Sequence, residues 1–355
     1  MRALTQLLLV CLSLWMLAPP RVAAQNEDVC AASDVLWLWK GALSAHSLEG
    51  DERPHSSIAM CHATGAPTVK VCEVAESLHA DRKYTYALSL IASDEVAKQG
   101  AFRTPQDEGA PFNFRLAFSS CADEDSDPKV FNEIASHDPL MFLHMGDLHY
   151  HNIEVNDVAV FRSAYNELFA SPSGRAMLAM DLPFAYMWDD HDYGPDNSDK
   201  TARGRSAALQ AYREFVPHYE LPGDKTEGSL SAIALILWCS TMPWIDDERK
   251  WGYFTHEQQE LINYMKGHNL NKWVPIIIGG PYSHGLFPGT GQYGLLDIQD
   301  DGKHVCVYYR GMNIVDGQLL EYDTCNPERT PPQAPYHPPP IPIRVMQRAW
   351  KKIKR

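Results

Sequence analysis

The segments PLMFLHMGDLHY (139–150) and LPFAYMWDDHDYGPDN (182–197) give the strongest indication of the fold class. Each opens with a short apolar and aromatic run of strand length and closes in carboxylates and histidines. Such runs are typical of buried strands in a sheet that is covered on both faces. Sites in sheets of this kind form where the strands end at their carboxyl side. We therefore expect both acidic endings to meet at one edge of a sheet.

The sequence around these stretches alternates between strand and helix patterns. FRLAFSSC (114–121) reads as an earlier strand, and DPKVFNEIASH (127–137) and VNDVAVFRSAYNELFAS (155–171) read as amphipathic helices. The order strand, helix, strand, helix, strand predicts an α/β layer. Further downstream the pattern predicts a helix over 256–269 and strands over 274–280, 291–298 and 304–310.

The segment before residue 104 has a different pattern. Short β-branched or aromatic runs at 35–43, 57–63, 68–74 and 84–92 are separated by turn residues. We predict a small immunoglobulin-like or fibronectin-like β-sandwich over 25–104. The run TPQDEGAP (104–111) predicts a linker, and the main α/β domain is expected over 112–325.

The N-terminus predicts secretion. Arg2 supplies a positive charge, Leu7 to Ala18 form an apolar run, and small residues at 22–24 fit a cleavage site before Gln25. A signal anchor is the alternative, but the run is short for a membrane span, which needs about 20 residues. We expect residues 1–24 to be a signal peptide and the mature chain to be secreted or at the cell surface.

The overall charge and the C-terminal tail bear on partners. A net charge of −14 argues against nucleic-acid binding through broad electrostatics, so we expect no nucleic-acid-binding module. Residues 326–355 are Pro-rich and then basic. The basic end predicts either weak contact with an anionic membrane surface or an ordinary solvated terminus. The sequence sets no oligomeric state.

The cysteines fit an oxidising compartment. Loss of Cys11 with the signal peptide leaves seven, an odd number, so at least one is unpaired or used for chemistry. Cys306 and Cys325 lie in consecutive predicted strands, so a hairpin disulfide between them is expected. Cys61 and Cys72 flank a turn and form another possible pair. Cys121 ends a strand beside the acidic strand ends, which makes it a candidate metal ligand.

The chemistry is concentrated in the two acidic endings. Five carboxylates crowded together would repel one another unless they met cations, and two metal ions about 3.5–4 Å apart would neutralise them and could clamp a phosphate. Oxygen ligands with a phenol favour Fe(III), Mn or Ca. A solvated loop, a helix cap or a packed histidine is the alternative for each residue alone. The candidates are Asp147, His149, Tyr150, Asp189, Asp190, His191, Asp192, Asp196 and Asn197.

These strings resemble the PhoD-like alkaline phosphatase/phosphodiesterase family, which belongs to the calcineurin-like metallophosphoesterases and is related to purple acid phosphatases. The resemblance covers about 35–325 and rests on FRLAFSSC, HMGDLHY, WDDHDYGPDN, STMPW (240–244) and GGPYSHG (279–285) with GQYGLLD (291–297). It implies a four-layer α+β metallophosphoesterase sandwich that follows a small β-rich domain.

The resemblance also implies roles for individual residues. Cys121 and Tyr150 would bind a ferric ion, and Asp147 would bridge both metals. The second site, built from Asp190 and Asn197, would hold a divalent ion such as calcium, manganese or zinc. His191 would lie near the leaving group or phosphate, so the catalytic candidates are His191 and Asp147.

The chain departs from the family pattern in two places, and both read as internal deletions. The family usually has an Asp-x-Arg-type strand between WDDHD and STMPW, where this chain has only 200–230 and SAIALILW (231–238). The family has a further strand that ends in Gly-Asp-x-His and supplies more metal ligands, whereas no second string of that kind follows 146–149. The expected function is a secreted metal-dependent phosphomonoesterase or phosphodiesterase, with a phosphate ester as substrate. The alternative is a catalytically impaired relative that acts as a binding protein.

Overall fold

The computed structural model describes residues 9–10, 35–41, 55–63, 70–90, 96–107, 110–122, 124–199, 201–217, 238–240, 255–267, 276–278 and 291–325. Its largest sheet has six strands in the order β14-β13-β12-β7-β8-β9. Strands β7, β8 and β9 run parallel, whereas β12 pairs antiparallel with both β7 and β13, and β13 with β14. Their bounds are β7 Phe114–Ser119, β8 Met141–Met145, β9 Phe184–Met187, β12 Gln292–Asp300, β13 Val305–Asn313 and β14 Gly317–Cys325.

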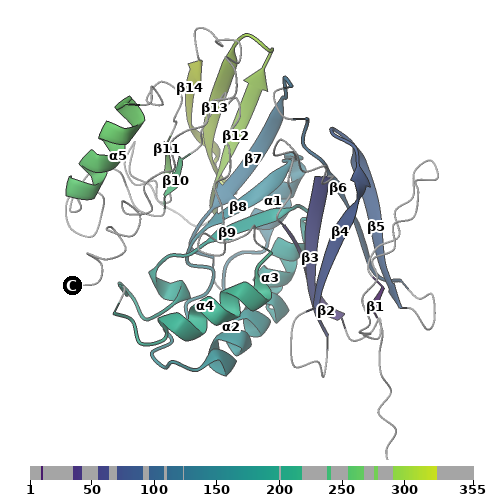
Figure 1. Ribbon diagram of the computed structural model, residues 1–355, viewed down its shortest axis with the longest axis vertical. Coiled ribbons are helices and arrows are strands. Elements are labelled where there is room, and N and C mark those ends of the chain that lie inside the picture. The colour runs from purple at the N-terminus through teal and green to yellow at the C-terminus, as the bar shows by residue number, and fades with distance from the viewer. Residues whose placement is uncertain are drawn as a thin grey trace, which may run out of the picture.

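Four helices gather beside β8 and β9, and they cover one face of the sheet (Figure 1). Helix α2 forms because Phe161, Tyr165 and Leu168 recur at helical spacing on its buried side. Its N-terminus is capped by Asp157, whose carboxylate accepts the Ala159 N–H at 2.9 Å. The helices are α1 Lys129–Ser136, α2 Val158–Ala170, α3 Pro172–Ala179 and α4 Arg205–Phe215.

The sequence did not predict α3 and α4. Helix α3 follows α2 directly, because Ser171 ends one helix and caps the next through the Gly174 N–H, and Pro172 occupies the first turn. Helix α4 buries a face of small residues with Phe215 against the same core. The mixed α/β architecture of this region is confirmed.

The N-terminal segment forms two antiparallel three-stranded sheets, β2-β3-β4 and β1-β5-β6. The strands predicted there are present, while their assembly into a closed sandwich stays a prediction. The two-residue strand β1 lies inside the predicted signal peptide, so cleavage after residue 24 would leave β5 and β6 as a hairpin. The strands are β1 Leu9–Val10, β2 Val35–Gly41, β3 His55–Ala63, β4 Lys70–Leu78, β5 Lys83–Leu90 and β6 Val96–Arg103.

Strand β2 joins the N-terminal sheets to the α/β core. The Trp39 ring is fully buried and stacks on Phe184 of β9 at 4.2 Å between centroids. Its indole N–H donates to the Phe184 carbonyl at 3.0 Å. The adjacent Lys40 ammonium is also buried and pairs with the Asp181 carboxylate. The N-terminal segment and the main domain therefore share a core across the predicted boundary at 104–111.

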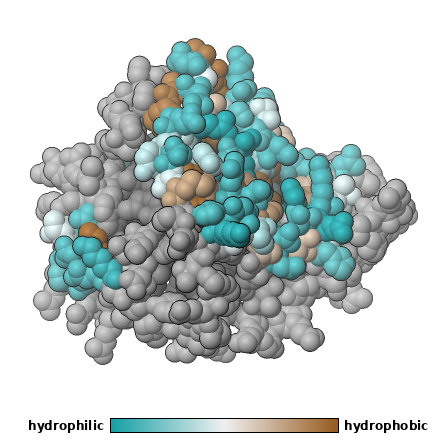
Figure 2. Space-filling model, turned by 90° about the horizontal axis from the view of Figure 1, so that it is seen from above, coloured by the Kyte–Doolittle hydropathy of each residue, from teal (hydrophilic) through white to brown (hydrophobic). Residues whose placement is uncertain are grey.

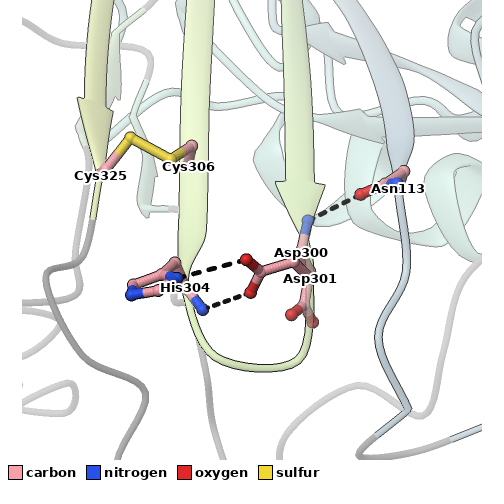
Figure 3. Close-up of a disulfide and its surroundings, with 6 residues drawn as sticks. All are labelled: Asn113, Asp300, Asp301, His304, Cys306 and Cys325. Carbon is pink, nitrogen blue, oxygen red and sulfur yellow. Dashed lines mark hydrogen bonds and ion pairs between the residues drawn. A yellow bond between two sulfur atoms is a disulfide. The ribbon is translucent and has the colours of Figure 1, made fainter.

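The disulfide predicted between Cys306 and Cys325 is present and links two residues that face each other in the β13–β14 pairing (Figure 3). It lies next to the β12–β13 turn, where the Asp301 carboxylate accepts the His304 N–H at 2.7 Å. Cys121 is a free thiol. The side chains of Cys61 and Cys72 lie outside the described part of the chain, and their pairing stays a prediction.

The remaining described elements are a short parallel strand pair and one helix. Strands β10 Trp238–Ser240 and β11 Ile276–Ile278 form the pair, and helix α5 Thr255–Gly267 matches the helix predicted over 256–269. Among the described helices, none has both the length and the apolarity to cross a bilayer. Hydrophilic side chains predominate over the described part of the face in Figure 2.

Candidate metal centre

The three parallel strands deliver polar residues to one point. Strands β7, β8 and β9 end at Ser119, Met145 and Met187, and the second residue after each is Cys121, Asp147 or Asp189. The parallel register pairs Ser119 with His144 and Met145 with Met187, so the three ends lie along the same sheet edge. This confirms the expectation that the acidic endings meet.

The backbone is unusual where these loops turn. Cys121, Asp147 and Asn197 have φ angles of 59°, 54° and 60°. Residues other than glycine rarely adopt this left-handed region, and such residues concentrate at functional sites. Gly146 has φ of 90°, and a Cβ there would lie 2.5 Å from the Asp189 Cβ. A glycine is therefore required for the loops after β8 and β9 to approach each other.

Asp147, Asp190 and His191 form the centre of the site. Each offers one ligand atom, and these atoms all lie within 4.8 Å of one another. Asp147 is buried, and burial followed by the charge of Asp190 raises the pKa of its carboxyl. A cation between the two carboxylates would relieve that repulsion.

Cys121 and Tyr150 converge on the same carboxylate. The Cys121 thiol lies 3.6 Å from Asp147 Oδ2, and the Tyr150 hydroxyl donates to that oxygen at 3.2 Å. Burial raises the pKa of the Cys121 thiol and also that of the Tyr150 phenol, so both are protonated without a metal. A bound metal ion would displace these protons, because thiolate and phenolate are the ligating forms.

His191 is held between the two acidic loops. Its backbone N–H donates to Asp147 Oδ1 at 3.3 Å, and its ring lies 4.3 Å from the Tyr150 ring. Nδ1 lies 2.9 Å from Asn152 Oδ1, and Nε2 lies 3.5 Å from an Asp196 oxygen. The imidazole therefore has an oxygen near each ring nitrogen.

Asn152 is a site residue that the sequence analysis missed. Its Oδ1 also accepts the Asp196 N–H at 3.0 Å, and its Nδ2 donates to the Tyr150 carbonyl at 3.1 Å. These two contacts fix the orientation of the amide and link the loop after β8 to the loop after β9. An asparagine between a histidine and an isoleucine carries no sequence signal for this role.

Asn197 lies beside Asp190, as the resemblance implied. The Asn197 backbone N–H donates to Asp190 Oδ2, and its side-chain amide donates to Asp196. The predicted second-site pair is thus brought together.

Two members of the predicted acidic and histidine cluster have other roles. Asp192 is buried, and its carboxylate accepts hydrogen bonds from the backbone N–H groups of Asp147, Leu148 and Asp189. It therefore stabilises the backbone of the loops and is not one of the converging ligand residues. His149 is buried against Tyr165, and no described residue hydrogen-bonds to its ring nitrogens. Burial lowers its pKa to about 3, so it is a neutral packed histidine. Chain spacing cannot distinguish a carboxylate that faces the site from one that caps backbone.

The donor set fits a metal ion. Two carboxylates and an imidazole lie within reach of one another, and a thiol and a phenol contact one of the carboxylates. Hard oxygen donors suit Ca²⁺, Mn²⁺ and Fe³⁺, and imidazole suits Zn²⁺ and iron. Burial, and then the charge of Asp190, raises the pKa of the Asp147 carboxyl, and a bound cation would stabilise its ionised form.

Comparison with known proteins supports the fold. No family model and no curated protein matches the sequence. Among solved structures, that of PhoD superposes with a TM-score of 0.60 at 13% identity, over 86% of this chain and 92% of PhoD. A purple acid phosphatase, PPD1 from yellow lupin (Lupinus luteus) seeds, matches at 10% identity over 87% of this chain and 77% of its own, but its TM-score of 0.43 supports no argument. The chain therefore shares the PhoD fold.

Proposed function

We propose that this protein is a metal-dependent hydrolase of phosphate esters. The observation that carries the proposal is the convergence of Asp147, Asp190 and His191 within 4.8 Å at the ends of β8 and β9. The shared fold with PhoD supports the same reading by analogy. A phosphomonoester or phosphodiester is the expected substrate.

The residues divide into two ligand sets that share Asp147. Cys121, Tyr150 and Asp147 would hold a ferric ion, because the thiol and phenol both contact the Asp147 carboxylate. Asp190 and Asn197, with Asp147, would hold a divalent ion such as calcium, manganese or zinc. The bound ions would supply Lewis-acid polarisation of the phosphoryl group and compensate its charge.

His191 is the proposed proton carrier. An acceptor oxygen lies near each ring nitrogen, Asn152 Oδ1 at 2.9 Å from Nδ1 and an Asp196 oxygen at 3.5 Å from Nε2. The side chain is 12% exposed, so a substrate oxygen can reach it. An imidazolium at that position would donate its proton to the leaving-group oxygen as the ester bond breaks.

The proposal is tested by assaying the purified protein with an aryl phosphate and a bis-aryl phosphodiester in the presence of Fe and Ca. Turnover that Asp147→Asn abolishes, with metal bound to the wild-type protein, supports it. No turnover together with less than one metal ion per chain would refute it.

A second candidate function is a binding protein that retains part of the site. The observation in its favour is that no second Gly-Asp-x-His string follows 146–149, so ligands expected from the family are missing from the sequence. Under this alternative the protein binds metal and inorganic phosphate but shows no turnover of either ester. Calorimetry with inorganic phosphate, run beside the assay, separates the two.

We also propose that the protein acts outside the cell. The support is the N-terminal sequence, in which a basic residue, an apolar run and a small-residue cleavage site follow in order. N-terminal sequencing of protein secreted by transfected cells should begin at Gln25. The basic tail is proposed to touch anionic membranes weakly, and binding to anionic vesicles that survives deletion of 341–355 would contradict that.

A further inference from the structure

We infer that Asp192 is the positioning residue of the metal centre, which holds the loops after β8 and β9 at the spacing that the ligands require. This inference rests on the proposed function. The Asp192 side chain is buried, with 2% of its surface exposed, and it contacts the main chain of Asp147. Its own carboxylate is not among the atoms that converge there.

Both Asp192 oxygens are occupied by main-chain donors. Oδ1 accepts the Leu148 N–H at 2.7 Å. Oδ2 accepts the Asp147 N–H and the Asp189 N–H, each at 2.7 Å. Three short hydrogen bonds from the main chain offset the cost of burying this carboxyl group.

These three donors come from both sides of the site. Asp147 and Leu148 follow β8, whereas Asp189 follows β9 and directly precedes the 3₁₀ helix Asp190–Asp192. That helix also carries Asp190 and His191, so one carboxylate ties the main chain at Asp147 to the start of the helix that carries the other two converging residues. The left-handed backbone at Asp147, with φ of 54°, is a conformation that needs such support.

No other side chain of similar size can make this set of contacts. An asparagine at 192 has one oxygen and one NH₂, so its NH₂ would face at least one of the three N–H donors. Asp192→Asn is therefore a nearly isosteric change that removes at least one of the three hydrogen bonds, and sets an NH₂ against that N–H donor, without opening a cavity. Asp157→Asn is the matched control, because Asp157 also accepts a backbone N–H, as the N-cap of α2, and is not among the residues whose ligand atoms converge.

The test uses the full-length protein and two readouts. In the metal-free protein, amide hydrogen exchange should quicken in Asp192→Asn within 145–150 and 187–193 and stay at the wild-type rate in β12. In a titration with Mn²⁺, Asp192→Asn should bind about 10–100-fold more weakly than wild type, whereas Asp157→Asn should not differ.

Each alternative outcome contradicts the inference. Unchanged exchange in the two segments, or unchanged Mn²⁺ affinity, would overturn it. Faster exchange that extends through β12 would also overturn it, since Asp192 would then support the whole fold. If wild type bound no Mn²⁺, the proposed function would fail, while the exchange data would still decide by themselves whether Asp192 links the loops.

Discussion

Asp147 and Asp190, which follow two neighbouring parallel strands, place carboxylate oxygens within 4.8 Å of each other. Their mutual repulsion contributes to the raised pKa of Asp147, after burial. Two like charges held this close by rigid strand ends are typical of a site built for a cation. The proposed function depends on this pair of carboxylates.

His191 should affect turnover more than metal binding. Replacing it with asparagine removes the proton donor but keeps a side chain that can reach Asn152. General acid catalysis contributes typically about 10²–10⁴-fold. We expect His191→Asn to lower kcat by about that factor on esters with poor leaving groups and by less on activated aryl esters. An equal loss on both substrates, together with loss of metal, would identify His191 as a ligand instead.

Cys121 should be an unpaired thiol that metal protects. Alkylation of the unfolded, unreduced protein followed by mass mapping should find Cys121 modified and Cys306 linked to Cys325. In the folded protein, alkylation should slow when Fe or Mn²⁺ is added, because the thiol lies 3.6 Å from the Asp147 carboxylate. The reaction rate should not respond to metal in Asp147→Asn. Cys121 found in a disulfide would contradict the proposed ligand set.

Trp39 should be essential to the main domain although it lies in the N-terminal segment. Its ring is fully buried against Phe184 and its N–H bonds the carbonyl there. Truncating a buried tryptophan costs about 3–5 kcal/mol. Urea unfolding of Trp39→Ala should show a loss of this size, and Val160→Ala, on the outer side of α2, should show little. If residues 112–325 alone unfolded with wild-type stability, the shared core would be refuted.

The sequence predicted the strand ends but not every side chain around them. The apolar runs before Asp147 and Asp190 identify β8 and β9, and the parallel order brings their ends together, so the ligand pair could be foreseen. The directions of His149 and Asp192 could not, because spacing along a loop does not tell whether a side chain faces the site or the main chain. The packing of Trp39 against Phe184 could not be predicted either, because contacts between segments distant in sequence leave no local pattern.

His144 should make the protein sensitive to acid. It lies in β8, is completely buried among aromatic rings, and burial lowers its pKa to about 3. The unfolded chain takes up a proton near pH 6.5 and the folded chain does not, so stability falls as the pH drops below 6.5.

A phenylalanine at position 144 should remove this contribution. At pH 5.5 the histidine should cost about 1.4 kcal/mol of unfolding free energy relative to pH 7.5. Urea unfolding at both pH values should therefore show His144→Phe losing less stability on acidification than wild type, with the difference confined to pH below 6.5. An identical pH dependence in both proteins would show that His144 is protonated in the folded state.

Metal stoichiometry in wild type and Asp147→Asn, determined by elemental analysis after reconstitution and desalting, shows whether these residues hold a metal ion. Because Asp147 is the carboxylate that Cys121, Tyr150 and the His191 main chain all contact, the account predicts at least one tightly held ion in wild type and none in the variant, with unchanged circular dichroism. Wild type without metal, or a variant that keeps a full equivalent of iron, would contradict it.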